Sequence, residues 1–216
     1  SVPDALVLVP SGKLEQRRRE MPYLDVEPIG FDSSELDIED WKFLMGVMGN
    51  DAMYIKRMNQ ALRQIRNRLT LDNLFTAISD SRLSGAQTEL ARSRLEFVQE
   101  YIRDGMFLRD HIRPGRLIVV DLRDELIEQD EALGLFMVML KIFANSHYEG
   151  RPFSKLVVFD EAHKYMDTSF INEVTGVVRE MRHKATSILI ASQDPKSVPL
   201  SIIELSSQII LHRFSS

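Results

Sequence analysis

Short apolar runs recur along the chain, separated by longer stretches in which apolar residues return at every third or fourth position. The runs lie within Ala5–Val9, Leu117–Asp121, Leu156–Asp160, Ile188–Ser192 and Gln208–Arg213. A short run that is apolar on both faces is typical of a strand buried in a parallel sheet. These segments are therefore predicted to be strands, and the chain is predicted to have an α/β fold.

Helical spacing dominates from about residue 36 to residue 110, and it returns between the later strands. A short helix is predicted at Thr70–Ile78, with the threonine as its N-cap. Longer helices are predicted at Asp130–Ala144 and Ser169–Arg182. Residues 13–34 are interrupted by two prolines and a glycine and are predicted to be a loop.

This alternation predicts three segments. Residues 1–35 would supply an N-terminal strand and loop, residues 36–113 an all-helical insertion, and residues 114–216 the main part of a parallel sheet with its helices. Right-handed crossovers place the carboxyl ends of such strands along one edge of the sheet. Ligands of open α/β sheets bind at that edge, so the residues that follow each strand are the first candidates for function.

Composition restricts the class of protein further. The chain has 216 residues, 44% of them hydrophobic, a formal net charge of −5 and no cysteine, which rules out disulfides and thiolate metal sites. No apolar run approaches the roughly 20 residues that span a bilayer. We therefore expect a cytoplasmic protein with no membrane contact in this segment. Because the chain begins at Ser1 and ends at Ser216 after a strand-like segment, we also expect it to be an excised fragment.

Two adjacent acids, Asp160 and Glu161, follow the apolar run at Leu156. A nucleotide hydrolase needs one carboxylate to fix Mg²⁺ and a second group to activate the attacking water. Acids at the end of a buried strand can divide those tasks. The alternative interpretation is a solvated strand end or the start of a helix cap.

Three further residues join this hypothesis. Gln193 follows the next predicted strand, where its amide can contact both the attacking water and a phosphate oxygen; otherwise it is a loop glutamine. Arg182 lies near the end of the intervening helix and can act as an arginine finger on a neighbouring subunit, or merely as a helix-end cation. Its rivals are Arg179, Lys184 and Arg213. His163 has no second ligand at helical spacing and is expected to be a contact residue beside the acids.

Two clusters of cations have a plainer interpretation. The segment Lys56–Arg68 carries five cations and no acid and can meet a DNA backbone, but an amphipathic helix with a solvated face is the favoured interpretation. The run Arg17–Arg19 is expected to lie in a solvated loop. The net charge does not indicate a surface coated for nucleic acid, but a ring-shaped motor can confine its positive charge to a pore.

The phosphate-binding pattern G-x-x-x-x-G-K-[ST], the Walker A motif, is absent. Gly12-Lys13 is the one Gly-Lys pair; Leu14 follows it, and Val7 stands at the earlier glycine position. Without the backbone amides and lysine of that loop, triphosphate binding is expected to be very weak. No phosphate-binding residues are therefore identified in this sequence.

Several strings together resemble the HerA/FtsK superfamily of hexameric DNA-pumping ATPases, in particular the HerA-like branch. The strings are Leu156–Met166 (LVVFDEAHKYM, similar to its Walker B strand), Val178–Pro199 (similar to its arginine-bearing helix end and sensor strand), Ser206–Phe214 (similar to its last core strand), Pro114–Asp124 and Leu6–Gly12. The resemblance covers nearly the whole chain, and its specific part is the last hundred residues.

That resemblance implies a RecA-like P-loop NTPase fold with a helical insertion, a homohexameric ring, ATP with Mg²⁺, double-stranded DNA, and a nuclease or another accessory protein as a further partner. It implies Asp160 as the magnesium-side acid, Glu161 as the catalytic base, Gln193 as the sensor and Arg182 as the arginine acting in trans. The sheet would lack the strand that leads into the P-loop, so residues 208–213 are expected to pair poorly or against another chain.

Other motor families fit less well. DEAH-box helicases share Asp-Glu-Ala-His but should show Ser-Ala-Thr after the next strand, where this chain has Ala191-Ser192-Gln193. An AAA+ motor would place asparagine at the sensor, and an ABC ATPase needs a signature loop. Asp194 departs from the HerA-like pattern, which often has a basic residue there. Two hypotheses remain: part of an ATP-driven DNA translocase or helicase, or a degenerate, non-catalytic scaffold or regulatory partner.

Overall fold

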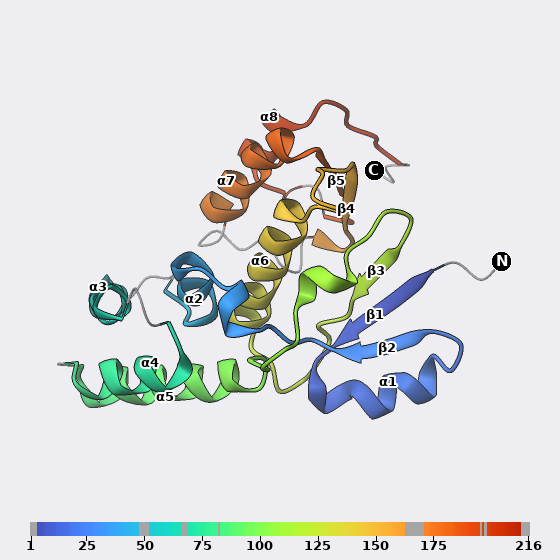
Figure 1. Cartoon of the computed structure of the whole chain (residues 1–216). Coiled ribbons are helices and arrows are strands. Elements are labelled where there is room, and N and C mark those ends of the chain that lie inside the picture. Colours follow the sequence, from blue (N-terminus) through green and yellow to red (C-terminus); the bar gives the residue numbers. More distant parts are fainter. Residues whose placement is uncertain are drawn as a thin grey trace. The chain divides into compact units, whose positions relative to one another are not determined.

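The computed structural model describes residues 4–47, 52–65, 69–81, 83–162, 171–194, 196 and 198–212 (Figure 1). The chain forms two compact units, Ser1–Phe153 and Ser154–Ser216. Each unit contains a parallel sheet with helices packed beside it, and every strand pair in the two sheets is parallel. The predicted α/β fold class is therefore confirmed. The three sequence segments 1–35, 36–113 and 114–216 stay a prediction about domain organisation.

The sheet of the first unit has the order β2-β1-β3. Its central strand β1 (Ala5–Val9) pairs with β2 (Asp25–Pro28) and with β3 (Leu117–Val120), so that Val7 faces both Val26 and Val119. All four residues from Leu6 onwards in β1 are at most 2% exposed. The uninterrupted apolar run thus marks the strand that is covered on both faces and hydrogen-bonded on both edges.

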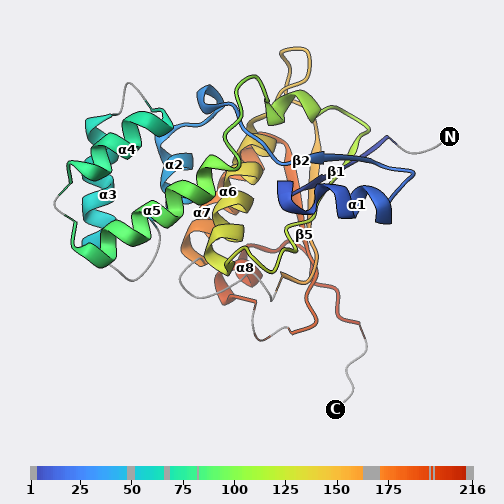
Figure 2. The same ribbon diagram turned by 90° about the horizontal axis from the view of Figure 1, so that it is seen from below.

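Residues 13–34 are not a loop, so that prediction is wrong. A 3-10 turn η1 (Ser11–Lys13) leads into the helix α1 (Leu14–Glu20), and β2 follows as an edge strand. α1 lies against β2 (Figure 2). Leu14 and Met21 pack on the apolar cluster of Val7, Val9 and Val26 from the two strands. β2 ends at Pro28, which fits the end of an edge strand because proline has no N–H for a ladder.

The helical block predicted after residue 36 is present. It comprises η2 (Ser33–Glu35), α2 (Ile38–Leu44), α3 (Ala52–Gln64), α4 (Leu71–Ser79), α5 (Gly85–Gln99) and η3 (Leu108–His111). The helices begin where capping residues stand: Asp37 forms a capping box with Asp40, Thr70 accepts from the amide of Asn73, and Ser84 caps α5. Figure 2 shows α3, α4 and α5 packed in succession, as their contacts require.

The long helix α6 (Gln129–Asn145) packs against α2 within the first unit. Gly134 makes this approach possible, because a Cβ there would lie 2.6 Å from the carbonyl oxygen of Phe43. Further along α6, Lys141 donates from Nζ to Asp37 and Glu39 at 3.0 Å and forms an ion pair with the buried Asp40 at 2.9 Å. One cation thus ties the N-terminal turn of α2 to α6.

Replacing Lys141 with methionine is expected to destabilise the first unit by about 3 kcal/mol, because Asp40 would remain buried without its counter-ion. Burial raises the pKa of Asp40 to about 6, despite its hydrogen bonds and the neighbouring lysine. Asp40 is therefore ionised at pH 8 and takes up a proton more readily at pH 5, so the loss should be larger at pH 8. Urea unfolding at both pH values measures it, with Lys42→Met on α2 as the control. Equal losses in the two variants would contradict the assigned role.

The second unit contains β4 (Lys155–Phe159), α7 (Ile171–Met181), η5 (Arg182–Lys184), β5 (Thr186–Ile190) and α8 (Leu200–Leu205). β4 and β5 pair in parallel, and α7 contacts both β5 and α8. The strand predicted at Leu156–Asp160 therefore forms one residue earlier, and the one predicted at Ile188–Ser192 forms two residues earlier. Both strands end just before the polar residues of interest.

The strand predicted at Gln208–Arg213 does not form within the described residues. Residues 208–212 have no strand pairing, and Ile209, Ile210 and Leu211 are more than 60% exposed. An apolar run becomes a strand only where a neighbouring strand accepts and donates its backbone hydrogen bonds, and none does so here. This agrees with the expectation of poor pairing for residues 208–213. Arg213 itself lies outside the described residues.

No helix in the described part of the chain is long and apolar enough to cross a membrane.

Candidate functional site

The carboxyl edge of the β4–β5 sheet brings together three of the residues singled out in the sequence. Asp160 and Glu161 follow β4 directly, and Gln193 lies three residues beyond β5. Because the strands are parallel and adjacent, both chain segments leave the sheet at the same edge. The sequence argument predicted this proximity, and the structure contains it.

Glu161 and Gln193 are in direct contact. The side-chain nitrogen Nε2 of Gln193 donates to Oε1 of Glu161 at 2.5 Å. Two backbone hydrogen bonds extend the pairing beyond the strands: the amide of Ala191 donates to Phe159 at 2.8 Å, and the amide of Ala162 donates to Ala191 at 3.0 Å. These bonds fix the backbone on both sides of the side-chain contact, so the pair is held by the sheet itself.

The backbone of Glu161 has a left-handed conformation, with φ of 53°. A residue with a Cβ adopts this region at a cost on the order of 1–3 kcal/mol, and such residues cluster at functional sites. The turn is fixed by Asp160, whose Oδ1 accepts from the amide of Glu161 at 3.0 Å. Glu149 and Ala185 have the same conformation elsewhere, so the left-handed turn supports a site here only together with the contact to Gln193.

The loop after Gln193 is shaped by its own polar side chains. Oγ of Ser192 donates to the carbonyl oxygen of Asp194 at 2.9 Å and accepts from its amide at 3.2 Å, while Oδ1 of Asp194 accepts from the amide of Lys196 at 3.1 Å. These are the local turns that serine and aspartate favour. Asp194, which departs from the HerA-like pattern, thus has a structural use in this chain.

The arginine predicted to act in trans is placed only by its backbone. Arg182 begins η5, directly after α7, and its side chain lies outside the described atoms. Among its rivals, Lys184 donates to Glu180 at 3.0 Å and Arg179 is exposed in the last turn of α7. His163 and Arg213 lie outside the described residues.

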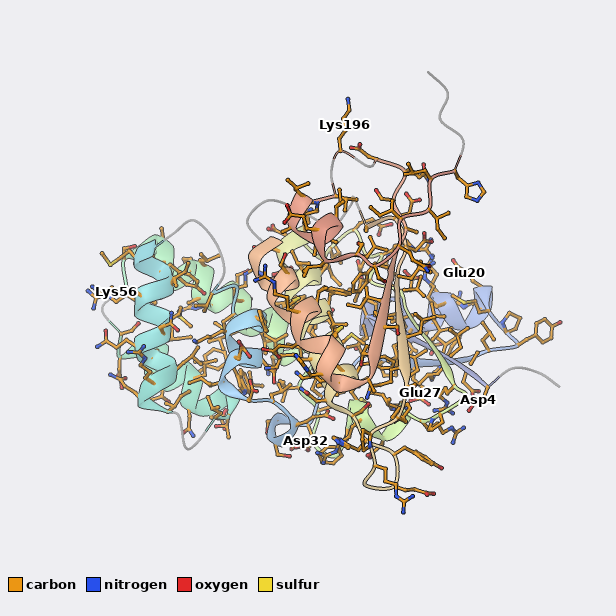
Figure 3. The ribbon with its side chains drawn as sticks, turned by 90° about the horizontal axis from the view of Figure 1, so that it is seen from above. Asp4, Glu20, Glu27, Asp32, Lys56 and Lys196 are labelled. Atoms are coloured by element: carbon orange, nitrogen blue, oxygen red, sulfur yellow. The ribbon has the colours of Figure 1, made fainter. Side chains whose placement is uncertain are left out.

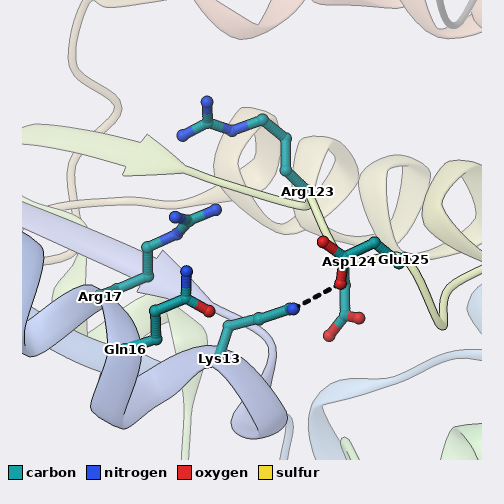
Figure 4. Close-up of a pocket in the computed structure, with 6 residues that line it drawn as sticks. All are labelled: Lys13, Gln16, Arg17, Arg123, Asp124 and Glu125. Atoms are coloured by element: carbon teal, nitrogen blue, oxygen red, sulfur yellow. Dashed lines mark hydrogen bonds and ion pairs between the residues drawn. The ribbon is translucent and has the colours of Figure 1, made fainter.

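The carboxyl edge of the first unit's sheet forms a separate pocket between η1, α1 and the loop after β3 (Figure 4). Its lining is charged throughout apart from one glutamine: Lys13, Gln16, Arg17, Arg123, Asp124 and Glu125. Nζ of Lys13 donates to Glu125 at 2.7 Å, and Nε of Arg17 lies 3.0 Å from the buried carboxylate of Asp121. The cations of this pocket are paired with carboxylates of the same chain.

This pocket changes the interpretation of Arg17, Asp121 and the Gly12-Lys13 turn. Arg17 was assigned to a solvated loop, but its side chain is 13% exposed and is paired with Asp121 and Glu20. Asp121 received no role, although it ends its apolar run as Asp160 does. A hydrogen bond from Arg123, with the charge of Arg17 nearby, holds the pKa of Asp121 below its usual range. The Gly12-Lys13 turn also has its lysine paired with Glu125 instead of presenting it to a phosphate.

The residues at the β4–β5 edge fit the magnesium-binding part of a nucleotide site and not the phosphate-binding part. Mg²⁺ in nucleotide enzymes is held by one or two carboxylates together with phosphate oxygens and water. Asp160 is exposed at the strand end and suits that role, and among the described residues no group of three or more acids and histidines could hold a metal alone. The Walker A pattern that would bind the phosphates, by contrast, is absent from the sequence.

Comparison with known proteins identifies the fold. No protein family and no curated protein matches this sequence. Among solved structures, the chain is similar to VirB4 of Thermoanaerobacter pseudethanolicus, with a TM-score of 0.55 and 12% sequence identity. The likeness covers 94% of this chain and 65% of the VirB4 chain, so this chain spans less than two thirds of that one. At this identity the likeness shows the fold alone: an α/β architecture of parallel strands with helices beside them.

Proposed function

We propose that this chain is part of an ATP-hydrolysing motor of the FtsK/HerA type that moves double-stranded DNA. ATP and Mg²⁺ are its cofactors, and it works as a homo-oligomeric ring, in which six subunits are expected. The likeness to VirB4, a P-loop ATPase, supports the coarse part of this proposal. The DNA substrate, the ring and any nuclease or accessory partner rest on the sequence resemblance.

Each residue at the β4–β5 edge has a proposed task. Asp160 binds Mg²⁺ together with phosphate oxygens and water, which leaves Glu161 to take a proton from the attacking water. Gln193 orients that water or a phosphate oxygen from the neighbouring strand. Arg182 stabilises the developing charge in the site of the adjacent subunit.

One observation carries the proposal: the 2.5 Å hydrogen bond between Gln193 and Glu161 at the shared carboxyl edge. A helix cap or a solvated strand end does not require the two side chains to meet. An acid and an amide held together by adjacent parallel strands form a pair that can bind one water between them after a small side-chain rotation. The backbone of Glu161 is left-handed, and its side chain meets the loop that follows β5.

The gene sequence distinguishes the proposed motor from the non-catalytic alternative. A motor needs a strand followed by G-x-x-x-x-G-K-[ST] encoded in frame with this sequence, because this sequence contains no such loop. A scaffold or regulatory partner needs none. Reading the gene upstream of Ser1 distinguishes the two: a Walker A motif supports the motor, and a start codon close to Ser1 supports the scaffold.

Replacing Gln193 with alanine in the full-length protein is expected to lower kcat of ATP hydrolysis about 10- to 100-fold, the value of one hydrogen bond to a charged group. The affinity for ATP should change little, because the phosphates are held elsewhere. Steady-state kinetics separates kcat from KM, and Ser187→Ala in β5 is a control in the same sheet. An unchanged kcat would remove Gln193 from the site.

A further inference from the structure

The helix α3 differs from every other α-helix of the described structure in its charge. Its sequence from Ala52 to Gln64 contains Lys56, Arg57 and Arg63 and no acid. Each of the other seven α-helices contains at least one aspartate or glutamate. In a chain with a formal net charge of −5, this local excess of positive charge stands apart from the rest of the surface.

The cations of α3 gather on one face. At 100° per residue, Lys56, Arg57, Gln60, Arg63 and Gln64 lie within an arc of about 120°. All of them are exposed except Arg57, which is half-buried. Lys56 projects outward from α3 (Figure 3). We call these five residues the α3 basic face; its cations extend about 10 Å along the helix axis.

The opposite face of α3 is buried. Tyr54, Met58, Ala61 and Leu62 are at most 3% exposed, and the helix packs against α2 and α4. The hydroxyl of Tyr54 donates to the carbonyl oxygen of Met45 at 2.9 Å and fixes the rotation of the helix. The α3 basic face is therefore held outward by the packing of the apolar side and does not depend on a partner for its orientation.

No cation of the α3 basic face has a carboxylate partner among the described residues. Several cations outside α3 do form ion pairs, among them Lys13, Arg17, Arg94 and Lys141. Unpaired cations interleaved with amide side chains suit a partner that offers many negative charges in a row. The amides of Gln60 and Gln64 can donate to the same oxygens without adding a repulsive acid.

We propose that the α3 basic face contacts the phosphate backbone of double-stranded nucleic acid, specifically DNA, without reading its sequence. Lysine, arginine and glutamine are among the residues that contact backbone phosphates in protein–DNA complexes. The partner is named on the basis of the proposed motor function, but the contact itself needs neither ATP nor the β4–β5 edge. This contact would give the helical block a role in binding the DNA along which the motor moves.

A membrane surface is a poorer partner for this helix. Helices that lie on bilayers bury their apolar face in the lipid, and the apolar face of α3 is already covered by the block. An acidic protein would satisfy the charges equally, and a direct comparison distinguishes it from DNA.

The test uses the 216-residue chain and a duplex of arbitrary sequence, with binding measured by fluorescence anisotropy over a range of salt concentrations. The variant Lys56→Gln/Arg57→Gln/Arg63→Gln removes the charge of the α3 basic face and keeps good helix formers. Its matched control, Arg19→Gln/Arg92→Gln/Lys196→Gln, removes three exposed cations that have no carboxylate partner among the described residues. Circular dichroism checks that both variants keep their helices.

The α3 variant should bind the duplex at least about tenfold more weakly than the control variant does. The slope of log K against log salt concentration should be smaller in magnitude by about two to three. The swap Lys56→Arg/Arg57→Lys/Arg63→Lys should retain binding, because only charge is needed. Equal affinity and slope in variant and control would overturn the assignment, as would tight binding of poly-glutamate with none of DNA. If either of these results is found while Glu161→Gln still abolishes turnover in the full-length protein, the motor proposal stands and the proposed α3 contact with DNA does not.

Discussion

Replacing Glu161 with glutamine in the full-length protein should lower ATP turnover by about 10²- to 10⁴-fold, the contribution of a positioned general base. Nucleotide binding should be retained, because the substitution removes proton acceptance and keeps the shape of the side chain. The neighbouring Gln193 can still donate to the new amide oxygen, so the turn after β4 should persist. Single-turnover hydrolysis and fluorescent-nucleotide binding measure the two quantities separately.

The matched control for this prediction is Glu149→Gln. Glu149 is another glutamate in a left-handed turn, with φ of 50° and an exposed side chain, but it lies in the first unit and outside the candidate site. Its substitution should leave turnover unchanged. The isolated 216-residue chain, which contains no Walker A motif, should hydrolyse ATP negligibly. Unchanged turnover in the full-length Glu161 variant would remove the catalytic role, and vigorous hydrolysis by the isolated chain would show that the phosphates are bound in another way.

Replacing Arg182 with alanine should lower turnover of the assembled full-length protein by about 10³- to 10⁵-fold, the range for an arginine finger. The position of Arg182 directly after α7, away from the carboxyl edge of β4 and β5, favours action on a neighbouring subunit. Mixed assemblies test the idea. Arg182→Ala subunits combined with Glu161→Gln subunits should regain part of the activity, because some interfaces then join an intact Glu161 to an intact Arg182.

Two controls make the mixing experiment decisive. Subunits with Gln193→Ala should not rescue subunits with Glu161→Gln, since both residues belong to one site and every site would lack one of them. Lys184→Ala, which breaks the pair with Glu180 on the same turn, should cost little. If demonstrably mixed assemblies never regain activity with the Arg182 variant, the residue is a helix-end cation and Arg213 becomes the next candidate.

The local sequence pattern was sufficient to predict a strand or helix wherever the burial of its residues follows directly from that pattern. The apolar run at Ala5–Val9 predicted the central strand of the first sheet, and the capping residue Thr70 predicted where α4 begins. Polar residues after the strands at Leu156 and Ile188 predicted a shared edge, because consecutive parallel strands leave a sheet on the same side. Each of these inferences uses only neighbours in the sequence and the regular geometry of strands and helices.

The apolar pattern alone did not decide which segments become strands. β2, with the sequence Asp-Val-Glu-Pro, has one buried residue, Val26, and becomes a strand because β1 offers it a free edge. Residues 208–212 have the stronger apolar pattern, yet they remain unpaired because no described strand offers them one. Strand formation depends on a partner for the backbone hydrogen bonds, and a single segment does not contain that information.

The sequence by itself determined the α/β class, the helical block and the set of candidate residues at the strand ends, because periodicity and capping are local properties of the chain. Only the tertiary structure decided that Gln193 touches Glu161, that Glu161 takes a left-handed turn, and that Arg17 neutralises Asp121 instead of facing solvent. The packing of α3 likewise decided that its three cations face outward together. Contacts between residues distant in sequence depend on how strands pair and helices pack, and that arrangement is a property of the whole fold.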